Sequence, residues 1–395
     1  MSQIKPQGLR AYFNLSRSNF MGRRLEDALA TWTNLRGWSS AEKLVVVESD
    51  DWGAIRMPGK RALEALTGRG LGIDDSRFDH LDSLESGEDL RLLFELLEKH
   101  VDSEGCPAVM TLNVVMGNPD FEAIRRDGFE RFHHESFFDS YRRYCGEELE
   151  DLWKCAVTDG LIRPQFHARE HLNSILWMRD LKDGREPTRL AFDYGFYGLA
   201  GCTSSSVQNS YLAAYWAENR VELEEMKMIL ADGLNQFASA FGFRSRSFIG
   251  CNYVWPMELE PFLADQGIML LQGQRGQLQP RLNEHGRAAI QRRYTGQKNQ
   301  FGQRYSVRNV RFEPFEDEVK DWVGIALKQI QQSFLFNRPA VVSTHRINYT
   351  SGMSARHRDR NLSLLNELLL RIRSLWPEVQ FISSDRLCER MQAAR

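Results

Sequence analysis

The sequence predicts an α/β protein built on a parallel β-sheet or barrel, and two patterns support this fold class. Short apolar runs bounded by polar residues, such as 44–47 and 107–116, are typical of strands buried on both faces. Longer segments between them, such as 85–101 and 361–376, carry apolar residues at helical spacing. Strands that alternate with helices along a chain favour parallel pairing. The sequence shows no internal repeat at a solenoid period.

We expect the chain to begin with an N-terminal helical extension over residues 1–40. Residues 41–395 then form a single barrel domain, with insertions near 54–160 and 273–304. We expect strands at 43–49, 107–116, 161–166, 243–249, 268–272, 305–313, 339–344 and 379–383. We expect helices at 60–66, 85–101, 172–181, 210–241, 315–336 and 361–376. The segment 121–160 is mainly helical, whereas 183–212 is loop-rich and 273–304 is a polar excursion.

Glycine and proline positions support several of these boundaries. Gly68 and Gly70 end the helix that begins at Lys60, because glycine readily leaves the helical conformation. Asn118 and Pro119 mark the exit turn of the second strand.

Composition excludes several classes of protein. A chain of 395 residues with 42% hydrophobic residues can bury the core of one large domain or two medium ones. The formal net charge of −2 gives no footprint for nucleic acid or an anionic membrane. No apolar stretch approaches the roughly 20 residues of a transmembrane helix, and residues 1–20 lack the apolar core of a secretory signal. The six cysteines form no CxxC pair, so we expect reduced thiols in a cytoplasmic protein.

The first predicted strand runs directly into two adjacent carboxylates, Asp50 and Asp51. Ligands gather at the carboxyl ends of parallel strands, so this position is where an active site is expected. Two desolvated carboxylates repel each other and need a cation or a shared proton. The alternative is a capping turn in which one of them accepts backbone N–H bonds.

Two histidines follow the third predicted strand, His167 and His171. If a helix starts there, their spacing of four places both imidazoles on one face, where they can reach one metal ion. Two imidazoles and one carboxylate suit zinc or another borderline divalent ion, with positions left for water and substrate. An isolated HxxxH also occurs by chance, and its weight here comes from its position after a strand.

Two further strands end in polar residues. The strand at 243–249 contains Arg244 and Arg246 and leads to Asn252 and Tyr253, and the strand at 339–344 leads to His345. Because parallel strands present their carboxyl ends at one edge, we expect these residues to meet the aspartates and histidines.

This ordered set of residues resembles the polysaccharide deacetylase superfamily, also called the NodB-homology or carbohydrate esterase family four group. The resemblance spans about residues 43–390 and implies a distorted (β/α) barrel of seven strands. It implies that Asp50 is the general base, that Arg246 (with Arg244 as a competitor) orients it, and that His345 is the general acid. It also implies that the metal ligands are Asp51, His167 and His171. A backbone N–H near Asn252 and Tyr253 would hold the oxyanion.

The chain departs from the usual motifs of that family at several positions. Glu48 and Ser49 replace a threonine and an aromatic residue, and Ala168 replaces a serine or threonine. The segment that begins at Arg246 lacks two prolines. These departures indicate a divergent member. The gaps between the motifs, notably 54–166 and 254–344, are also longer than in compact members, and we expect these insertions to shape a different cleft.

The resemblance implies a metal-dependent hydrolase that removes an acyl group, with N-acetyl as the expected case, from a sugar or a related small amide. Zinc is the expected metal, with cobalt, nickel or iron as alternatives. Trp52, Asn252, Tyr253 and Tyr349 are expected to bind substrate, since three of them are aromatic and can stack on a sugar ring. We expect no nucleic acid partner and no membrane span, and the sequence leaves the oligomeric state open.

Two other functions remain open at this point. One is a carbohydrate-binding barrel that has kept the fold and lost turnover. The other follows from residues 167–171, which also spell the inverted zinc-protease motif H-x-x-E-H with Glu170 as base. That motif needs a helix and a third ligand such as Glu224 or Glu225, and it leaves both aspartates unexplained. We therefore expect Glu170 to pair with a basic residue such as Arg169.

Overall fold

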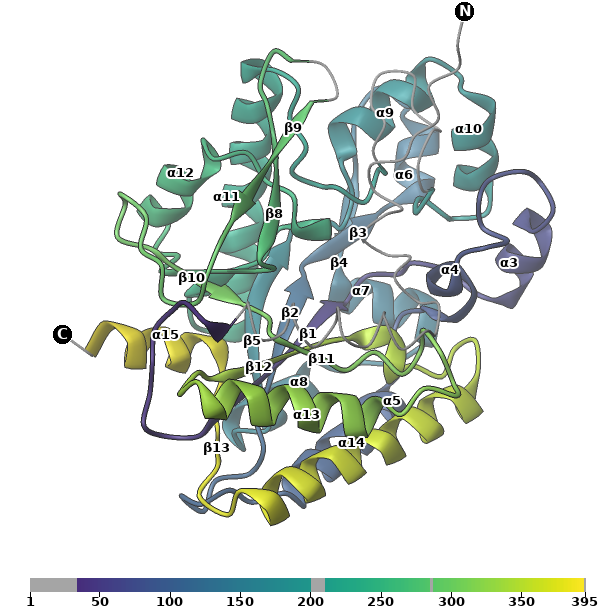
Figure 1. Ribbon diagram of the computed structural model, residues 1–395. Helices are drawn as coiled ribbons and strands as arrows, with labels where there is room; N and C mark the ends of the chain where they lie inside the picture. Colours follow the sequence, from purple (N-terminus) through teal and green to yellow (C-terminus); the bar gives the residue numbers. More distant parts are fainter. Residues whose placement is uncertain (1–33, 200–209, 285–286, 394–395) are drawn as a thin grey trace, which may run out of the picture.

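The computed structural model describes residues 34–199, 210–284 and 287–393 (Figure 1). The expected N-terminal extension over residues 1–40 therefore lies mostly outside the described residues. Within the described ranges, no helix is long and apolar enough to cross a lipid bilayer.

A sheet of nine strands forms the centre of the molecule, and its strand pairs are all parallel. Its order is β10-β7-β6-β5-β2-β1-β12-β11, and β13 pairs with the start of β1. The strands are β1 (Leu44–Trp52), β2 (Met110–Val115), β5 (Ile162–Ala168), β6 (Ser247–Phe248), β7 (Leu270–Gly273), β10 (Arg304–Val307), β11 (Val310–Arg311), β12 (Ala340–His345) and β13 (Gln380–Phe381). The predicted parallel α/β fold is confirmed.

One continuous segment closes this sheet into a barrel. β10 lies at one edge of the strand order and β11 at the other, yet only Arg308 and Asn309 separate them in the chain. The backbone N–H of Arg308 donates to the carbonyl oxygen of Gly273 in β7 at 3.0 Å. The next N–H, that of Asn309, donates to the carbonyl oxygen of Val341 in β12 at 3.1 Å.

The segment 304–311 thus changes partner from β7 to β12 at these two residues. When β10 and β11 are taken as one strand, the barrel contains seven strand positions: β1, β2, β5, β6, β7, β10–β11 and β12. The expectation of a distorted seven-stranded barrel is confirmed.

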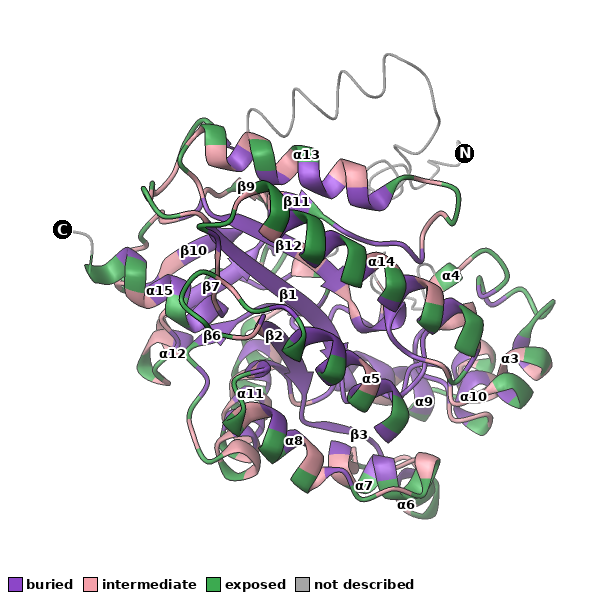
Figure 2. Ribbon diagram, turned by 90° about the horizontal axis from the view of Figure 1, so that it is seen from below, coloured by how far each residue is buried: buried purple, intermediate pink, exposed green. Residues whose placement is uncertain are grey.

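The strand β1 lies between β12 and β2, and all nine of its residues are buried. Its apolar start, 44–47, suits a strand with no face toward water. Figure 2 shows the buried strands at the centre with partly exposed helices around them. An apolar core therefore lies between the sheet and the outer layer of helices.

The helices pack outside the sheet, with α13 against β11 and β12 and α11 and α8 against β5. The main ones are α3 (Lys60–Leu66), α5 (Gly87–Glu98), α8 (Glu150–Thr158), α9 (Ser174–Lys182), α11 (Arg220–Phe241), α13 (Trp322–Leu335) and α14 (Ala355–Leu375). Shorter or additional ones are α4 (Arg77–Leu81), α6 (Phe121–Arg126), α7 (Phe137–Ser140), α10 (Glu186–Asp193), α12 (Leu259–Asp265) and α15 (Ser384–Ala393). The start of α5 is a capping box between Ser86 and Asp89, which satisfies two backbone donors.

The expectation of a polar excursion at 273–304 needs correction, and two other segments contain short elements that were not expected. The polar excursion 273–304 contains an antiparallel hairpin of β8 (Gly276–Pro280) and β9 (Ala288–Arg292), which rises above the barrel in Figure 1. The mainly helical segment 121–160 includes β4 (His134–Ser136), which pairs with β3 (Gly117–Pro119). The loop-rich segment 183–212 contains α10. Tertiary packing decides these short elements, because their own sequence periodicity is weak.

A network of buried charges fixes the segments that leave β1 and β12. The guanidinium of Arg346, which directly follows β12, is fully buried. Its Nη2 lies 3.0 Å from Oδ1 of Asp82, and its Nη1 lies 2.9 Å from Oε2 of Glu85. Nη1 also donates to the carbonyl oxygen of Ala54, just beyond β1. Burial raises the pKa of both carboxyl groups, and Arg346 opposes this rise.

We expect Arg346→Met to lower the free energy of unfolding by about 3–5 kcal/mol, because two buried carboxylates lose their main partner. Arg386→Met is the matched control, since this side chain is 71% exposed and pairs with Glu389 at the surface. Its loss should cost less than about 1 kcal/mol. Urea denaturation measures both values, and equal losses would contradict a stabilising role for the network.

Candidate active site

The two aspartates reach the same site because β1 is irregular at its end. In a regular strand, neighbouring side chains point to opposite faces. The register between β1 and β2 shifts between Ser49 and Trp52, and Asp51 has the left-handed φ of 75°. Such a bulge redirects one side chain, and strained backbone of this kind is common at functional sites. Asp50 and Asp51 are both buried, and their contacts are to side chains, which does not favour the capping interpretation.

Asp51 lies between the two predicted histidine ligands. Its Oδ1 is 3.3 Å from Nε2 of His167 and 3.1 Å from Nε2 of His171. Nδ1 of His167 lies 2.9 Å from the carbonyl oxygen of Ile249, to which it donates its proton. This hydrogen bond fixes the ring and leaves Nε2 for another partner, as in protein metal sites. The structure therefore brings together the three residues proposed as metal ligands.

The spacing of the histidines has a different structural basis from the expected one. His167 belongs to β5, which continues to Ala168, and α9 begins only at Ser174. His171 lies in the bend between them, so the pair is not on one helical face. Asn173 caps α9 by accepting a hydrogen bond from the backbone N–H of Leu176, and this delays the start of the helix.

The same geometry does not favour the H-x-x-E-H peptidase motif, which needs its residues on a helix. The carboxylate of Glu170 is buried against Arg169, with Oε2 at 2.6 Å from Nε and Oε1 at 2.9 Å from Nη2. The hydroxyl of Ser174 also donates to Oε1 at 2.9 Å. The expected ion pair of Glu170 with a basic residue is thus observed.

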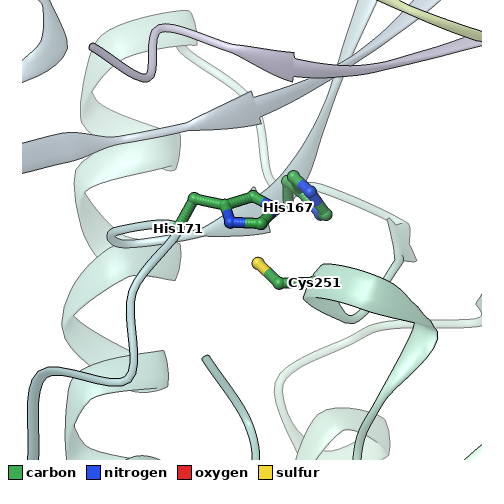
Figure 3. A group of neighbouring side chains, drawn as sticks. All are labelled: His167, His171 and Cys251. Atoms are coloured by element: carbon green, nitrogen blue, oxygen red, sulfur yellow. The ribbon is translucent and has the colours of Figure 1, made fainter. Parts of the chain in front are cut away.

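Cys251 is a neighbour of both histidines that the sequence analysis did not select. One ring nitrogen each of His167 and His171 and the Sγ of Cys251 all lie within 4.8 Å of one another. Figure 3 shows the three side chains side by side. Burial alone would raise the pKa of this thiol, but the two imidazoles lower it to about 7. The available signal was the position of Cys251, two residues beyond a predicted strand.

Asp50 is held by Arg308, and not by Arg246. Nη1 of Arg308 lies 2.6 Å from Oδ2 of Asp50, and Nη2 lies 2.7 Å from Oδ1. Nε of the same guanidinium lies 2.7 Å from Oε2 of Glu48. Burial would raise the pKa of Asp50, but Arg308 lowers it to about 2. Asp50 is therefore a carboxylate at any physiological pH.

The expected position of Arg246 is corrected by its contacts. Its guanidinium is directed to the surface, where Nη1 lies 3.0 Å from Oε1 of Glu389. Arg244 is also exposed. Both arginines come before the two-residue strand β6, so neither lies at the carboxyl end of that strand, where the site is. Arg308 was missed because it lies within the expected strand 305–313, where no motif distinguishes it from other residues.

His345 completes the site from the neighbouring strand. In the parallel register, the Cα of His345 pairs with that of Asp50, and Nε2 lies 3.7 Å from Oδ2 of Asp50. Nδ1 lies 2.6 Å from Oε1 of Glu313, whose Oε2 accepts a hydrogen bond from Asn348 at 2.9 Å. Burial would lower the pKa of His345, but Glu313 and then Asp50 raise it well above its usual value. Glu313 ends the expected strand 305–313, a position that could have identified it.

Two of the proposed substrate-binding aromatic residues belong to the core. Trp52 is fully buried, and its Nε1 donates to the hydroxyl of Ser49 at 2.9 Å. Tyr349 is also fully buried, with its hydroxyl 2.9 Å from that of Thr344. Both expectations are corrected, because the bulge in β1 and the turn after β12 direct these rings inward.

Tyr253 and Asn252 lie at the edge of the site. Tyr253 is half-buried, and its hydroxyl accepts a hydrogen bond from Nη1 of Arg308 at 2.9 Å. Asn252 is exposed. Both have left-handed φ values, 56° and 58° for Asn252 and Tyr253, in the short 3₁₀ turn Cys251–Tyr253.

Comparisons with known proteins give low similarity. No protein-family model matches the chain, and no curated protein matches it. Among solved structures, one described as a probable polysaccharide deacetylase from Pseudomonas aeruginosa is 8% identical, with 89% of this chain and 91% of that chain covered and a TM-score of 0.46. An allantoinase is 8% identical, with 91% and 93% covered and a TM-score of 0.44. A GH57-type branching enzyme from Pyrococcus horikoshii is 12% identical, with 90% and 71% covered and a TM-score of 0.43.

These likenesses are to the overall fold and carry no argument about activity. The strand order and the closure at Arg308 and Asn309 define the fold, and the contacts above define the site.

We expect any metal ion held by His167 and His171 to bind more tightly as the pH rises, because an imidazole that binds a metal must be neutral. Burial would lower the pKa of His171, but Cys251 and Asp51 raise it to about 9 in the metal-free protein. Zinc must therefore displace a proton below that pH. Competition with a chelator at several pH values measures this dependence. His133 is half-buried, and His133→Gln is a control that should leave the dependence unchanged. A zinc affinity independent of pH would contradict the assignment.

Proposed function

We propose that this protein is a metal-dependent hydrolase that removes an acyl group, with N-acetyl as the favoured case, from a sugar or another small amide. The observation that carries the proposal is the meeting of three groups at one end of the barrel. Asp51 with its two histidines, Asp50 with its arginine, and His345 with Glu313 all lie at the carboxyl ends of neighbouring strands.

The residues present suit a divalent metal ion, with zinc as the favoured ion. Asp51, His167 and His171 offer one carboxylate and two imidazoles, a donor set that zinc accepts. All three side chains are at least nine-tenths buried. The buried Nδ1 of His171 has no hydrogen-bond partner in the described part of the chain. An unsatisfied polar atom in such a cluster supports a ligand that the protein itself does not supply.

The residues of the chain divide the reaction between a base and an acid. A metal held by Asp51 and the histidines would lower the pKa of a water molecule and polarise the acyl carbonyl. Asp50 accepts a proton from the attacking water, and Arg308 holds this carboxylate ionised and in position. Glu313 raises the pKa of His345 and so favours the protonated imidazole, which donates its proton to the leaving nitrogen.

Exposure indicates how a substrate enters. The side chain of His345 is 20% exposed, whereas those of Asp50, Asp51, His167 and His171 are 3–7% exposed. The acid therefore lies nearest to solvent and the metal ligands lie deeper. This order suits a small acyl group that enters the site while the larger amine part stays outside, near His345 and Tyr253.

A carbohydrate-binding barrel without turnover remains the second candidate. The same fold would serve both, but binding alone does not require a protonated histidine beside a carboxylate base. Acetate release by the purified protein separates the two functions.

The first test compares Asp51→Ala with Asp50→Asn. Loss of a ligand should abolish zinc binding in Asp51→Ala. Asp50→Asn should keep one zinc per chain and lower the rate of acetate release from N-acetyl sugars and small amides by about 10²–10⁴-fold. Elemental analysis and an acetate assay measure the two effects. No acetate from any substrate with the zinc-loaded wild type would favour the binding barrel, and metal loss in both variants would contradict the division of roles.

A second test concerns the pH dependence. Glu313 raises the pKa of His345 above 6.5, the usual value for histidine. The protonated form of His345 therefore persists to higher pH, and kcat should decline only there. Glu313→Gln removes the charge, so this alkaline limb should move to lower pH with zinc content unchanged. The exposed Glu318→Gln should leave the limb in place. A profile that keeps its limb in Glu313→Gln would contradict the role of this residue.

A further inference from the structure

We propose that Cys251 is a fourth protein ligand of the metal, so that one carboxylate, two imidazoles and one thiolate surround the ion. The proposal depends on the proposed function only for the presence of a metal at Asp51, His167 and His171. It adds a ligand that the resemblance to the deacetylase family does not imply.

The first argument is the position of the thiol. Its Sγ and one nitrogen of each imidazole form a group whose members all lie within 4.8 Å of one another. Figure 3 shows the sulfur directed toward the space beside the two rings. Asp51 contacts the same two histidines, at 3.1 and 3.3 Å. The imidazoles are thus shared by a carboxylate and a thiol, and all four side chains are buried.

The second argument is that one backbone segment places both His167 and Cys251. The carbonyl of Ile249 accepts the hydrogen bond from Nδ1 of His167, and Cys251 follows two residues later. A Cβ at Gly250 would meet the ring of Trp255 at 2.7 Å and the carbonyl oxygen of Val254 at 2.8 Å. Only glycine fits there, so the chain before Cys251 packs closely against Trp255 and the carbonyl of Val254, and this packing fixes the backbone that carries the thiol.

The third argument is the buried Nδ1 of His171. It makes no hydrogen bond within the described residues. An unsatisfied buried polar atom on a residue of this cluster supports a ligand that the described side chains do not supply.

A thiolate in the site has two chemical consequences. Sulfur and imidazole donors select zinc or cobalt over magnesium or manganese. Four protein donors would also leave fewer positions on the ion for water or substrate than three donors do. The resting site is then more closed than one built from three ligands.

Cobalt substitution tests the proposal without reliance on turnover. The full-length protein is stripped of metal and refilled with Co²⁺, and its near-ultraviolet spectrum is recorded. We expect a sulfur-to-cobalt charge-transfer band in the wild type and its loss in Cys251→Ser. Cys388→Ser is the matched control, because Cys388 is also buried and free but lies in α15. It should keep the band.

Zinc affinity gives a second measurement. Cys251→Ser and Cys251→Ala should bind zinc at least about tenfold more weakly than the wild type. Even the loss of a partner outside the ligand shell costs that much, and a direct ligand should cost no less. Circular dichroism shows whether each variant is folded. The cobalt charge-transfer band of the wild type is a test that does not depend on the folding of any variant.

The outcomes separate this inference from the proposed function. One cobalt per chain without a charge-transfer band, with cobalt lost in Asp51→Ala, would overturn the role of Cys251 and keep the three-ligand site. A band that survives in Cys251→Ser would also overturn it. A wild type that binds neither zinc nor cobalt would overturn both proposals.

Discussion

The ion pair between Arg308 and two carboxylates of β1 is the interaction on which the barrel and its site both depend. Arg308 lies where the segment 304–311 leaves β7 for β12, so it occupies the point at which the barrel closes. Its guanidinium contacts Glu48 at 2.7 Å and Asp50 at 2.6 Å. One positive charge thus offsets two buried negative charges, which would otherwise be too costly to desolvate.

Polar residues of neighbouring strands extend this interaction through the barrel interior. Nδ2 of Asn113 donates to Asp50 at 2.7 Å and also to Gln272 at 2.9 Å. Gln272 in turn donates to the hydroxyl of Ser247 at 2.8 Å. β1, β2, β6 and β7 therefore each contribute a hydrogen-bonding group to this network. Such a network holds the base in one orientation, and a partly satisfied network would destabilise the core.

A second buried arginine fixes the other side of the site. Arg346 follows His345 directly, and its ion pairs with Asp82 and Glu85 attach the end of β12 to the segment before α5. The hydrogen bond to the carbonyl of Ala54 joins the same residue to the exit of β1. The acid and the two aspartates are thereby held on segments that share one anchor. Precise placement of this kind is what acid–base catalysis requires.

The sequence by itself determined the fold class and most of the site. Apolar runs identified nearly all the barrel strands, because a strand buried on both faces carries its signal in consecutive residues. The rule that ligands lie at the carboxyl ends of parallel strands identified Asp50, Asp51, His167, His171 and His345, and the structure brings these five together. These are local signals, since each depends on a few neighbouring residues.

Only the tertiary structure decided which residues support them. Arg308, Glu313 and Cys251 come from segments far from their partners in the chain. Glu313 and Cys251 lie at or just beyond the ends of expected strands, but this position alone does not indicate a contact with His345 or His167, and Arg308 has no such signal toward Asp50. The inward direction of Trp52 and Tyr349 likewise follows from a bulge and a turn, which depend on strand register. Local pattern therefore determined where the strands end, and long-range packing determined which side chains meet there.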